Sequence, residues 1–120
     1  MKDINDNMIA VKSKAFALRM IRVFKVLTGE RKEFILSKQA LRSGTSIGAN
    51  VREGIRAQTK ADFRAKMCVA LKEASETEYW LELLQESEYL NEAEANSLLT
   101  DCRELIRILM AISKTSADAH

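Results

Sequence analysis

No proline interrupts the 120 residues of this chain, and only four glycines do. Proline breaks helices and glycine weakens them, so long helices can form almost anywhere along the sequence. The strong helix formers alanine, leucine, glutamate, lysine and arginine are abundant. We therefore predict an all-α protein. Its length suits one domain with a single core, spanning residues 1–120.

Apolar side chains recur at intervals of three and four residues, which places them on one face of a helix. The pattern predicts four helices, at about residues 7–27, 30–58, 60–88 and 91–114. The most regular runs are Phe63, Met67, Ala70, Ala74, Thr77, Leu81 and Leu84, and then Ala95, Leu98, Cys102, Leu105, Leu109 and Ile112. Short connections make consecutive helices antiparallel neighbours, so we predict an antiparallel up-down-up-down four-helix bundle.

Polar residues and glycine mark the predicted helix boundaries. Gly29 should end the first helix, because glycine readily adopts the left-handed conformation found at such ends. Thr59 can cap the third helix with its hydroxyl group. Asn91 and Glu94 have the spacing of a capping box at the start of the fourth helix.

The second predicted helix carries an apolar stripe that begins at Phe34 and includes Gly44 and Gly48. Each glycine inside a helix costs about 1 kcal/mol relative to alanine. We expect the close approach of another helix to offset that cost. Asn50 lies on the neighbouring, semi-buried stripe and needs hydrogen-bond partners there.

The residue types needed for enzyme chemistry are scarce. The single histidine is His120, and the sequence lacks the Glu-x-x-His pairs that hold two metals in four-helix bundles. A serine or cysteine nucleophile would have no internal histidine as its base. The segment between Gly44 and Gly48 lacks the lysine of a phosphate-binding loop. We expect no enzymatic activity, no metal and no cofactor.

The sequence also bears on the cellular compartment. No stretch approaches the roughly 18 apolar residues of a membrane span, and the polar first residues are unlike a signal peptide. Cys68 and Cys102 lie beside apolar residues at helical positions, which favours reduced cysteines packed as small hydrophobic side chains. We expect a cytoplasmic protein without membrane contact.

The net charge of +2 conceals a strong asymmetry. Residues 1–72 contain 16 Lys and Arg against 6 Asp and Glu, and residues 73–120 contain 3 against 11. The two parts therefore carry +10 and −8. Because screening acts over about 8 Å at physiological salt, separated charged surfaces act locally.

Basic residues form rows at helical spacing on the first two predicted helices. On the second helix the row comprises Arg31, Lys38, Arg42, Arg52 and Arg56, and on the first it comprises Lys12, Arg19 and Arg22. Such rows neutralise nucleic-acid phosphates with little dependence on sequence. No aromatic residue interrupts the longer row, so binding would be directed to the RNA or DNA backbone. The alternative is a solvated face paired with acids of a neighbouring helix or subunit.

The acidic half suggests self-association. Glu78, Glu82 and Glu86 repel one another on the third helix unless a basic surface faces them, in the same subunit or in another. A second apolar strip on this helix comprises Val69, Tyr79, Trp80 and Leu83. Aromatic residues are enriched in interface cores, so the strip is interpreted as a subunit interface, with a widened core edge as the alternative. Head-to-tail contacts in which the acidic half of one subunit meets the basic half of the next can close a ring.

One segment of the second helix resembles a known family. Ser46-Ile47-Gly48-Ala49-Asn50-Val51-Arg52-Glu53-Gly54 is similar to the Ser-Ile-x-x-Asn-Ile-Ala-Glu-Gly signature of the bacterial four-helix bundle protein family. This family includes proteins encoded in intervening sequences of 23S rRNA genes, and it is related to the accessory variability proteins of diversity-generating retroelements. Ser75 and Glu78 resemble the Ser-x-x-Glu pair of its third helix. Arg52 replaces the usual small residue and adds to the basic row.

The resemblance implies a cytoplasmic four-helix bundle that assembles as a ring-shaped homopentamer. The retroelement members bind nucleic acid and the cognate reverse transcriptase through basic surfaces. Within the signature, Ile47 and Val51 would pack in the core, and Gly48 and Gly54 would permit close helix contact. Asn50 and Glu53 would fix helix ends or neighbouring backbone by hydrogen bonds.

Two hypotheses follow. The leading one is a non-enzymatic oligomeric bundle that binds RNA or DNA phosphates through its basic rows, as an accessory protein. The alternative is an assembly or scaffold module that binds a protein partner, such as a reverse transcriptase, and uses its basic and acidic faces for self-association.

Overall fold

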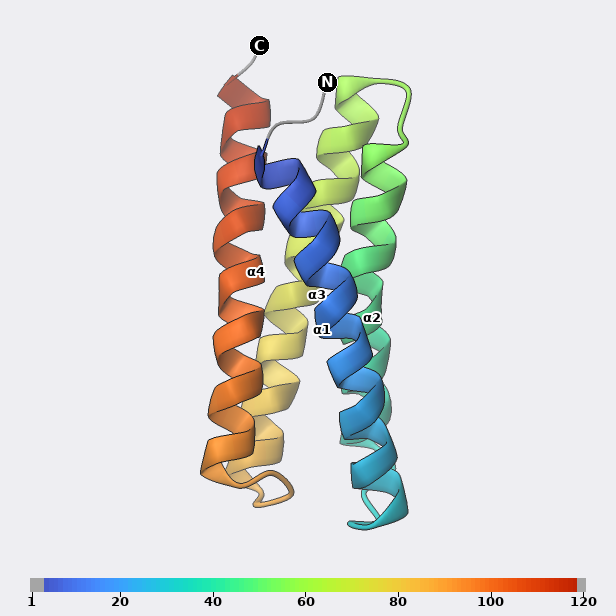
Figure 1. Cartoon of the computed structure of the whole chain (residues 1–120), viewed down its shortest axis with the longest axis vertical. Coiled ribbons are helices and arrows are strands. Elements are labelled where there is room, and N and C mark those ends of the chain that lie inside the picture. Colours follow the sequence, from blue (N-terminus) through green and yellow to red (C-terminus); the bar gives the residue numbers. More distant parts are fainter. Residues whose placement is uncertain (1–3, 119–120) are drawn as a thin grey trace.

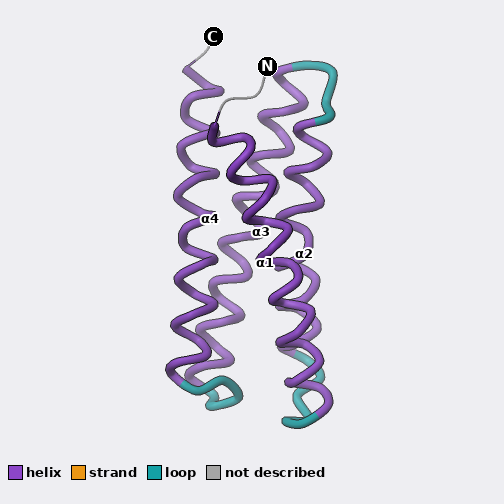
Figure 2. Tube along the Cα trace, in the orientation of Figure 1, coloured by secondary structure: helices purple, strands orange, loops and turns teal. Residues whose placement is uncertain are grey.

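The chain forms four α-helices in a computed structural model that describes residues 4–118, with the side chains of residues 5–114 (Figure 1). The helices are α1 (Ile4–Gly29), α2 (Leu36–Ile55), α3 (Lys60–Glu86) and α4 (Glu92–Asp118). Consecutive helices run antiparallel and are joined by short loops, as Figure 2 shows. The Cα trace is elongated, at 47 × 20 × 19 Å. The predicted all-α four-helix bundle is confirmed, and His120 lies outside the described residues.

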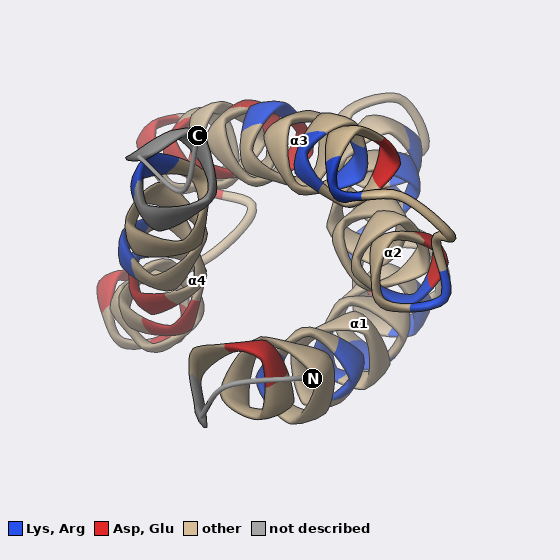
Figure 3. Ribbon diagram, turned by 90° about the horizontal axis from the view of Figure 1, so that it is seen from above, with Lys and Arg blue, Asp and Glu red and all other residues tan. Residues whose placement is uncertain are grey.

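Each helix packs against two neighbours. In the described part of the chain, α2 contacts α1 and α3, and α4 contacts α3 and α1, whereas diagonally opposed helices do not meet. Figure 3 shows the resulting square arrangement along the bundle axis. Every helix therefore has one inner face, two flanks along its neighbours and one face toward solvent. The flanks decide which charged residues of different helices can pair.

On α3 and α4 the core lies where the apolar spacing predicts it. On α3 and α4 every residue of the two predicted runs is buried, except for Phe63, which is half-buried and packs against the core. Cys102 is buried, and burial raises the pKa of its thiol to about 12, so the thiol stays protonated. Cys68 is exposed, so its predicted burial is wrong.

The second helix begins at Leu36, six residues later than predicted. The carboxylate of Glu33 accepts backbone N–H bonds from Ile35, Leu36 and Ser37 at 3.1, 2.9 and 2.6 Å. Burial opposes ionisation of this carboxylate, but the three N–H groups outweigh it and lower its pKa. Glu33 therefore supplies the cap that starts α2. Phe34, predicted to open the apolar stripe, lies before the helix and is 57% exposed.

Other boundary predictions are mostly confirmed. The Thr59 hydroxyl accepts the Asp62 N–H at 3.1 Å. Asn91 and Glu94 form the expected reciprocal capping box, with distances of 2.8 and 2.9 Å. The first helix ends at Gly29, but no described glycine has a positive φ, and Lys32 instead takes the left-handed conformation with φ 57°. The left-handed ending predicted for Gly29 is therefore wrong.

The capping box is coupled to the first loop by Arg31. Its guanidinium donates to both carboxylate oxygens of Glu94 at 2.8 and 2.7 Å and to the Tyr89 carbonyl at 2.8 Å. The hydrogen bonds from Arg31, together with the Asn91 N–H, lower the pKa of Glu94 from 4.5 to about 2. This contact joins the two loops at one end of the bundle.

Glu94 should therefore make folding sensitive to acid. In the unfolded chain its carboxylate takes up a proton near its ordinary pKa of 4.5, but in the folded chain only near 2. Its stabilisation is complete above the higher value and is lost as the pH falls toward the lower one. Because the side chain is 36% exposed, we expect about 1 kcal/mol. Urea unfolding at neutral pH and at about pH 3 should show that Glu94→Gln removes this part of the acid sensitivity. Equal pH dependence of the two proteins would contradict the assignment.

Candidate nucleic-acid interface

The predicted basic row of the second helix divides into paired and unpaired residues. Arg31 precedes α2 and is bound to Glu94 on α4, so its predicted membership of the row is wrong. Arg42 contacts two carboxylates of α3, at 3.4 Å from Glu73 and in a close pair with Glu76. These contacts match the alternative stated for the row, in which acids of a neighbouring helix neutralise it.

Helix geometry explains why Arg42 and Arg52 have different surroundings. Ten residues turn an α-helix by about 1000°, which is about 80° short of three full turns. The two side chains therefore point in directions about 80° apart. Arg42 lies on the flank of α2 that faces α3, where it contacts its acidic partners. Arg52 lies on the flank that faces α1. Residues that form one continuous row on a helical wheel thus face two different neighbouring helices.

The basic row on α1 is also largely paired. Lys12 binds Glu104 at 3.2 Å, and Arg19 binds Asp101 at 2.6 Å and the Ser97 hydroxyl at 2.9 Å. These partners are all on α4, because this row follows the flank of α1 that faces α4. Arg22 is exposed and lines a smaller hollow, of about 190 Å³, between the same two helices.

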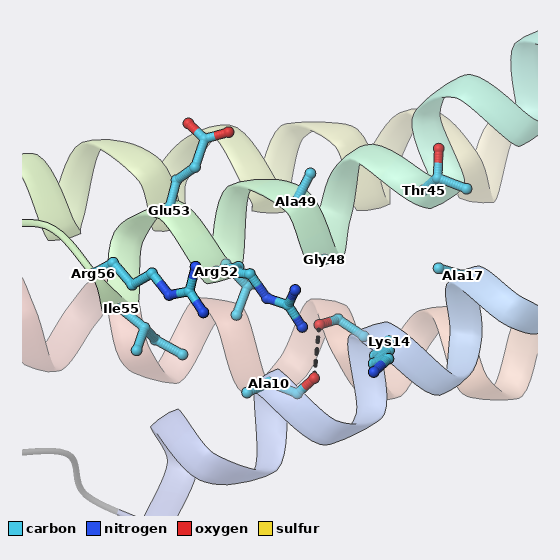
Figure 4. Close-up of a pocket in the computed structure, with 12 residues that line it drawn as sticks. Ala10, Lys14, Ala17, Thr45, Gly48, Ala49, Arg52, Glu53, Ile55 and Arg56 are labelled. Carbon is cyan, nitrogen blue, oxygen red and sulfur yellow. Dashed lines mark hydrogen bonds between the residues drawn. The ribbon is translucent and has the colours of Figure 1, made fainter.

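A groove between α1 and α2 is lined by cationic side chains that have no carboxylate partner among the described residues. It has a volume of about 770 Å³ and is lined by Lys14 of α1, by Arg52 of α2 and by Arg56, which caps the C-terminus of α2. All three side chains are exposed. Figure 4 shows the side chains of Arg52 on α2 and Arg56 at its C-cap directed across the groove toward α1. Their positive charge is available to an anion.

Small residues of both helices make up much of the floor of the groove. Five lining residues have side chains no larger than that of serine, namely Ala10, Ser13, Ala17, Gly48 and Ala49, and the other uncharged lining residues are Thr45, Val51 and Ile55. The two helices are close there, since a Cβ at Gly48 would lie 3.4 Å from the Ser13 carbonyl oxygen. The seam is therefore shallow, and the long cationic side chains form its rims.

Glu53 is the one acid among the residues that line the groove. Its carboxylate lies 2.9 Å from the Lys66 ammonium group on α3, and Figure 4 shows it directed away from the two arginines. The negative charge of Glu53 is therefore paired with Lys66 outside the groove. The groove remains cationic.

Lys14 was absent from the predicted site. Its position does not share the helical spacing of Lys12, Arg19 and Arg22, so it does not belong to the row of charge on that helix. The small residues beside it on α1, Ala10, Ser13 and Ala17, recur at intervals of three and four. This stripe of small residues could have indicated the position of Lys14 in the site, because it marks the flank of α1 that another helix can approach closely.

The sequence of the chain has clear relatives. Residues 5–111 match the family described as 23S rRNA-intervening sequence protein. The chain belongs to this family. It is similar to a crystal structure from Bacteroides thetaiotaomicron, described as a protein of unknown function from the S23 ribosomal protein family. The TM-score is 0.91 at 50% identity, over 92% of this chain and 99% of the other. No curated protein matches the chain.

The residues of the Ser46–Gly54 segment, which resembles the signature of the bacterial four-helix bundle protein family, mainly make structural contacts. Ile47 and Val51 are buried in the core, as expected. Gly54 packs against α3, where an added Cβ would lie 3.1 Å from the Lys66 Cβ. The Asn50 amide donates to the Ser46 carbonyl of its own helix at 2.8 Å. Glu53 contacts a side chain rather than backbone, so only part of the expectation for these two polar residues is confirmed.

The third-helix part of the signature lies on the other side of the bundle. Glu78 accepts from Arg103 of α4 at 2.8 Å, and Glu82 lies 3.4 Å from the same guanidinium group. Within the subunit, Arg103 thus faces two of the three acids in the repelling series. Ser75 and Glu86 are exposed.

The strip predicted as a subunit interface is partly open to solvent. Val69 is 40% exposed and Tyr79 is 54% exposed. Trp80 packs partly against the core and donates its indole N–H to Glu76 at 2.9 Å, and Leu83 is half-buried. The assignment of this strip to an interface stays a prediction.

No helix in the described part of the chain combines the length and apolar character of a membrane span. Within residues 4–118, no three histidine, cysteine, aspartate or glutamate side chains are grouped as ligands of a metal ion.

Proposed function

We propose that this protein is a non-enzymatic, oligomeric bundle of the cytoplasm that binds the backbone of RNA or DNA through the groove between α1 and α2. The observation that carries the proposal is the convergence of Lys14, Arg52 and Arg56 on one groove without acidic partners among the described residues. The name of the family refers to sequences that intervene in 23S rRNA, and such an RNA context is consistent with a phosphate-binding surface.

Binding would rest on charge-assisted hydrogen bonds from guanidinium and ammonium groups to phosphate oxygens. Each neutralised phosphate releases counterions, so affinity should fall steeply as salt rises. The groove has no aromatic lining residue, which favours backbone contact over base stacking. Lys38 and Arg22 are exposed outside the groove and would add to the attraction.

The oligomer is proposed on separate grounds. The exposed Val69 and Tyr79, with Trp80 and Leu83 beside them, offer an apolar surface on α3. The resemblance to the bacterial four-helix bundle proteins suggests a homopentameric ring for the assembly. The same surface supports the second candidate function, which is a scaffold that binds a protein partner such as a reverse transcriptase.

Nucleic-acid binding through the groove can be tested by comparing Arg52, which has no acidic partner among the described residues, with Arg42, which is paired with acids of α3. Labelled single-stranded RNA of mixed sequence is titrated with the wild-type protein and with Arg52→Gln and Arg42→Gln, while light scattering gives the mass. We expect Arg52→Gln to reduce affinity about tenfold and the slope of log K against log salt by about 1. Arg42→Gln should change affinity less than about threefold, because Glu73 and Glu76 already hold Arg42.

Three outcomes would contradict parts of the proposal. If the wild-type protein does not bind at low salt, the nucleic-acid function is wrong and the scaffold hypothesis is favoured. If both variants lose affinity equally, the whole basic face binds rather than the groove. A monomeric mass would contradict the ring.

A further inference from the structure

The shape of the α1–α2 groove bears on which form of nucleic acid it accepts. Its two rims carry cations, with Arg52 on α2 and Arg56 at the C-cap of α2 on one side and Lys14 on α1 on the other. The arginines are four residues apart at the C-terminal end of α2, about 6 Å along the axis. This distance is close to the spacing of adjacent phosphates in an extended single strand. A strand in the groove would therefore meet two cations on one side and one on the other.

The size of the groove limits what can enter it. Its volume of about 770 Å³ falls in the range of small-ligand sites, about 300–1,000 Å³, and would hold a few nucleotides. A nucleic-acid duplex is much wider than the seam between two packed helices, whose axes lie about 8–10 Å apart. It is also stiff, with a persistence length of about 150 base pairs for DNA. A duplex could touch the rims but could not enter the seam.

The floor suits the uncharged part of a strand. Ala17, Gly48 and Ala49 present methyl groups and backbone rather than long side chains. Sugar rings can contact such a surface, and no described lining residue is aromatic and able to stack a base. The floor would thus accept a strand of any sequence.

We infer that the α1–α2 groove is a binding site for a single strand of RNA or DNA, held by its phosphates between Lys14 and the two arginines. The protein therefore binds single-stranded nucleic acid in preference to a duplex of the same sequence. This inference rests on the proposed function and narrows it to one ligand class.

The test fills the groove without changing its charge. Ala49→Leu adds bulk at an exposed helical position that lines the groove, and leucine is a good helix former. Ala93→Leu makes the same change at an exposed position of α4, outside the groove, and is the matched control. Affinities for single-stranded RNA, single-stranded DNA and a duplex of the same sequence are measured at one salt concentration.

We expect the wild-type protein to bind both single strands at least tenfold more tightly than the duplex. Ala49→Leu should lower single-strand affinity at least tenfold and leave duplex affinity unchanged, and Ala93→Leu should change neither. Inorganic phosphate at matched ionic strength should compete weakly, because it occupies only one cationic position.

Failure of the single-strand inference and failure of the proposed function give different results. If nucleic acid binds with steep salt dependence but the duplex binds as tightly as the single strands, or if Ala49→Leu has no effect, the single-strand inference is overturned while the proposed function stands. If the wild-type protein binds none of the three ligands, the proposed function fails. If Ala49→Leu unfolds at a lower temperature, Ala17→Leu on the opposite helix supplies the second filling variant.

Discussion

Replacement of both Arg52 and Arg56 by glutamate is expected to weaken binding to single-stranded RNA by at least about 100-fold. Each arginine would make a charge-assisted hydrogen bond to a phosphate, and loss of about 1.4 kcal/mol per contact corresponds to tenfold in affinity. Two introduced carboxylates would add repulsion on the same rim. Fluorescence anisotropy at low salt would measure the change.

The matched control changes the same net charge elsewhere. Arg107 and Lys114 are exposed on α4, and their joint replacement by glutamate also shifts the net charge by −4. We expect less than about a tenfold loss of affinity from this variant, because it alters only the long-range field. If the two double variants lose affinity equally, net charge and not the groove determines binding.

Gly44→Ala should destabilise the fold by about 1–3 kcal/mol, although alanine favours helices by about 1 kcal/mol relative to glycine. A Cβ at Gly44 would lie 2.7 Å from the Cγ of Met20 on α1, and Met20 is 1% exposed in the core. The methionine side chain cannot move outward without disturbing its neighbours. Urea unfolding gives the free energy directly.

Two comparisons isolate this contact. Gly29→Ala meets no atom within 4 Å and should be neutral or slightly stabilising. In a Met20→Ala background the added Cβ at position 44 no longer clashes, so Gly44→Ala should then stabilise the protein. An increase in stability from Gly44→Ala in the wild-type background would show that the two helices do not need glycine there.

Much of the fold was predictable because it depends on local patterns. The spacing of apolar residues on α3 and α4 identified their buried faces, and Thr59 and Asn91 marked helix starts that the structure confirms. The start of α2 was not predictable in this way. Glutamate and phenylalanine at positions 33 and 34 fit a helix by propensity, and only the fold of the chain around Glu33 makes its carboxylate the cap.

The candidate site was predictable only in part, because charge rows do not indicate the neighbouring helix. Arg52 and Arg56 were found from their spacing, and both line the groove. Arg31 was assigned to the same row, yet it pairs with a glutamate 63 residues away. Lys14 was missed because its role depends on which helix faces it.

The central claim is that unpaired cations of the α1–α2 groove bind phosphates. Its most direct test is the salt dependence of single-stranded RNA affinity for the wild-type protein and for the double variant Arg52→Glu with Arg56→Glu, measured side by side. We predict a steep slope of log K against log salt for the wild-type protein and a slope reduced by about 2 for the variant, since two phosphate contacts are lost. Equal slopes for the two proteins would contradict the claim.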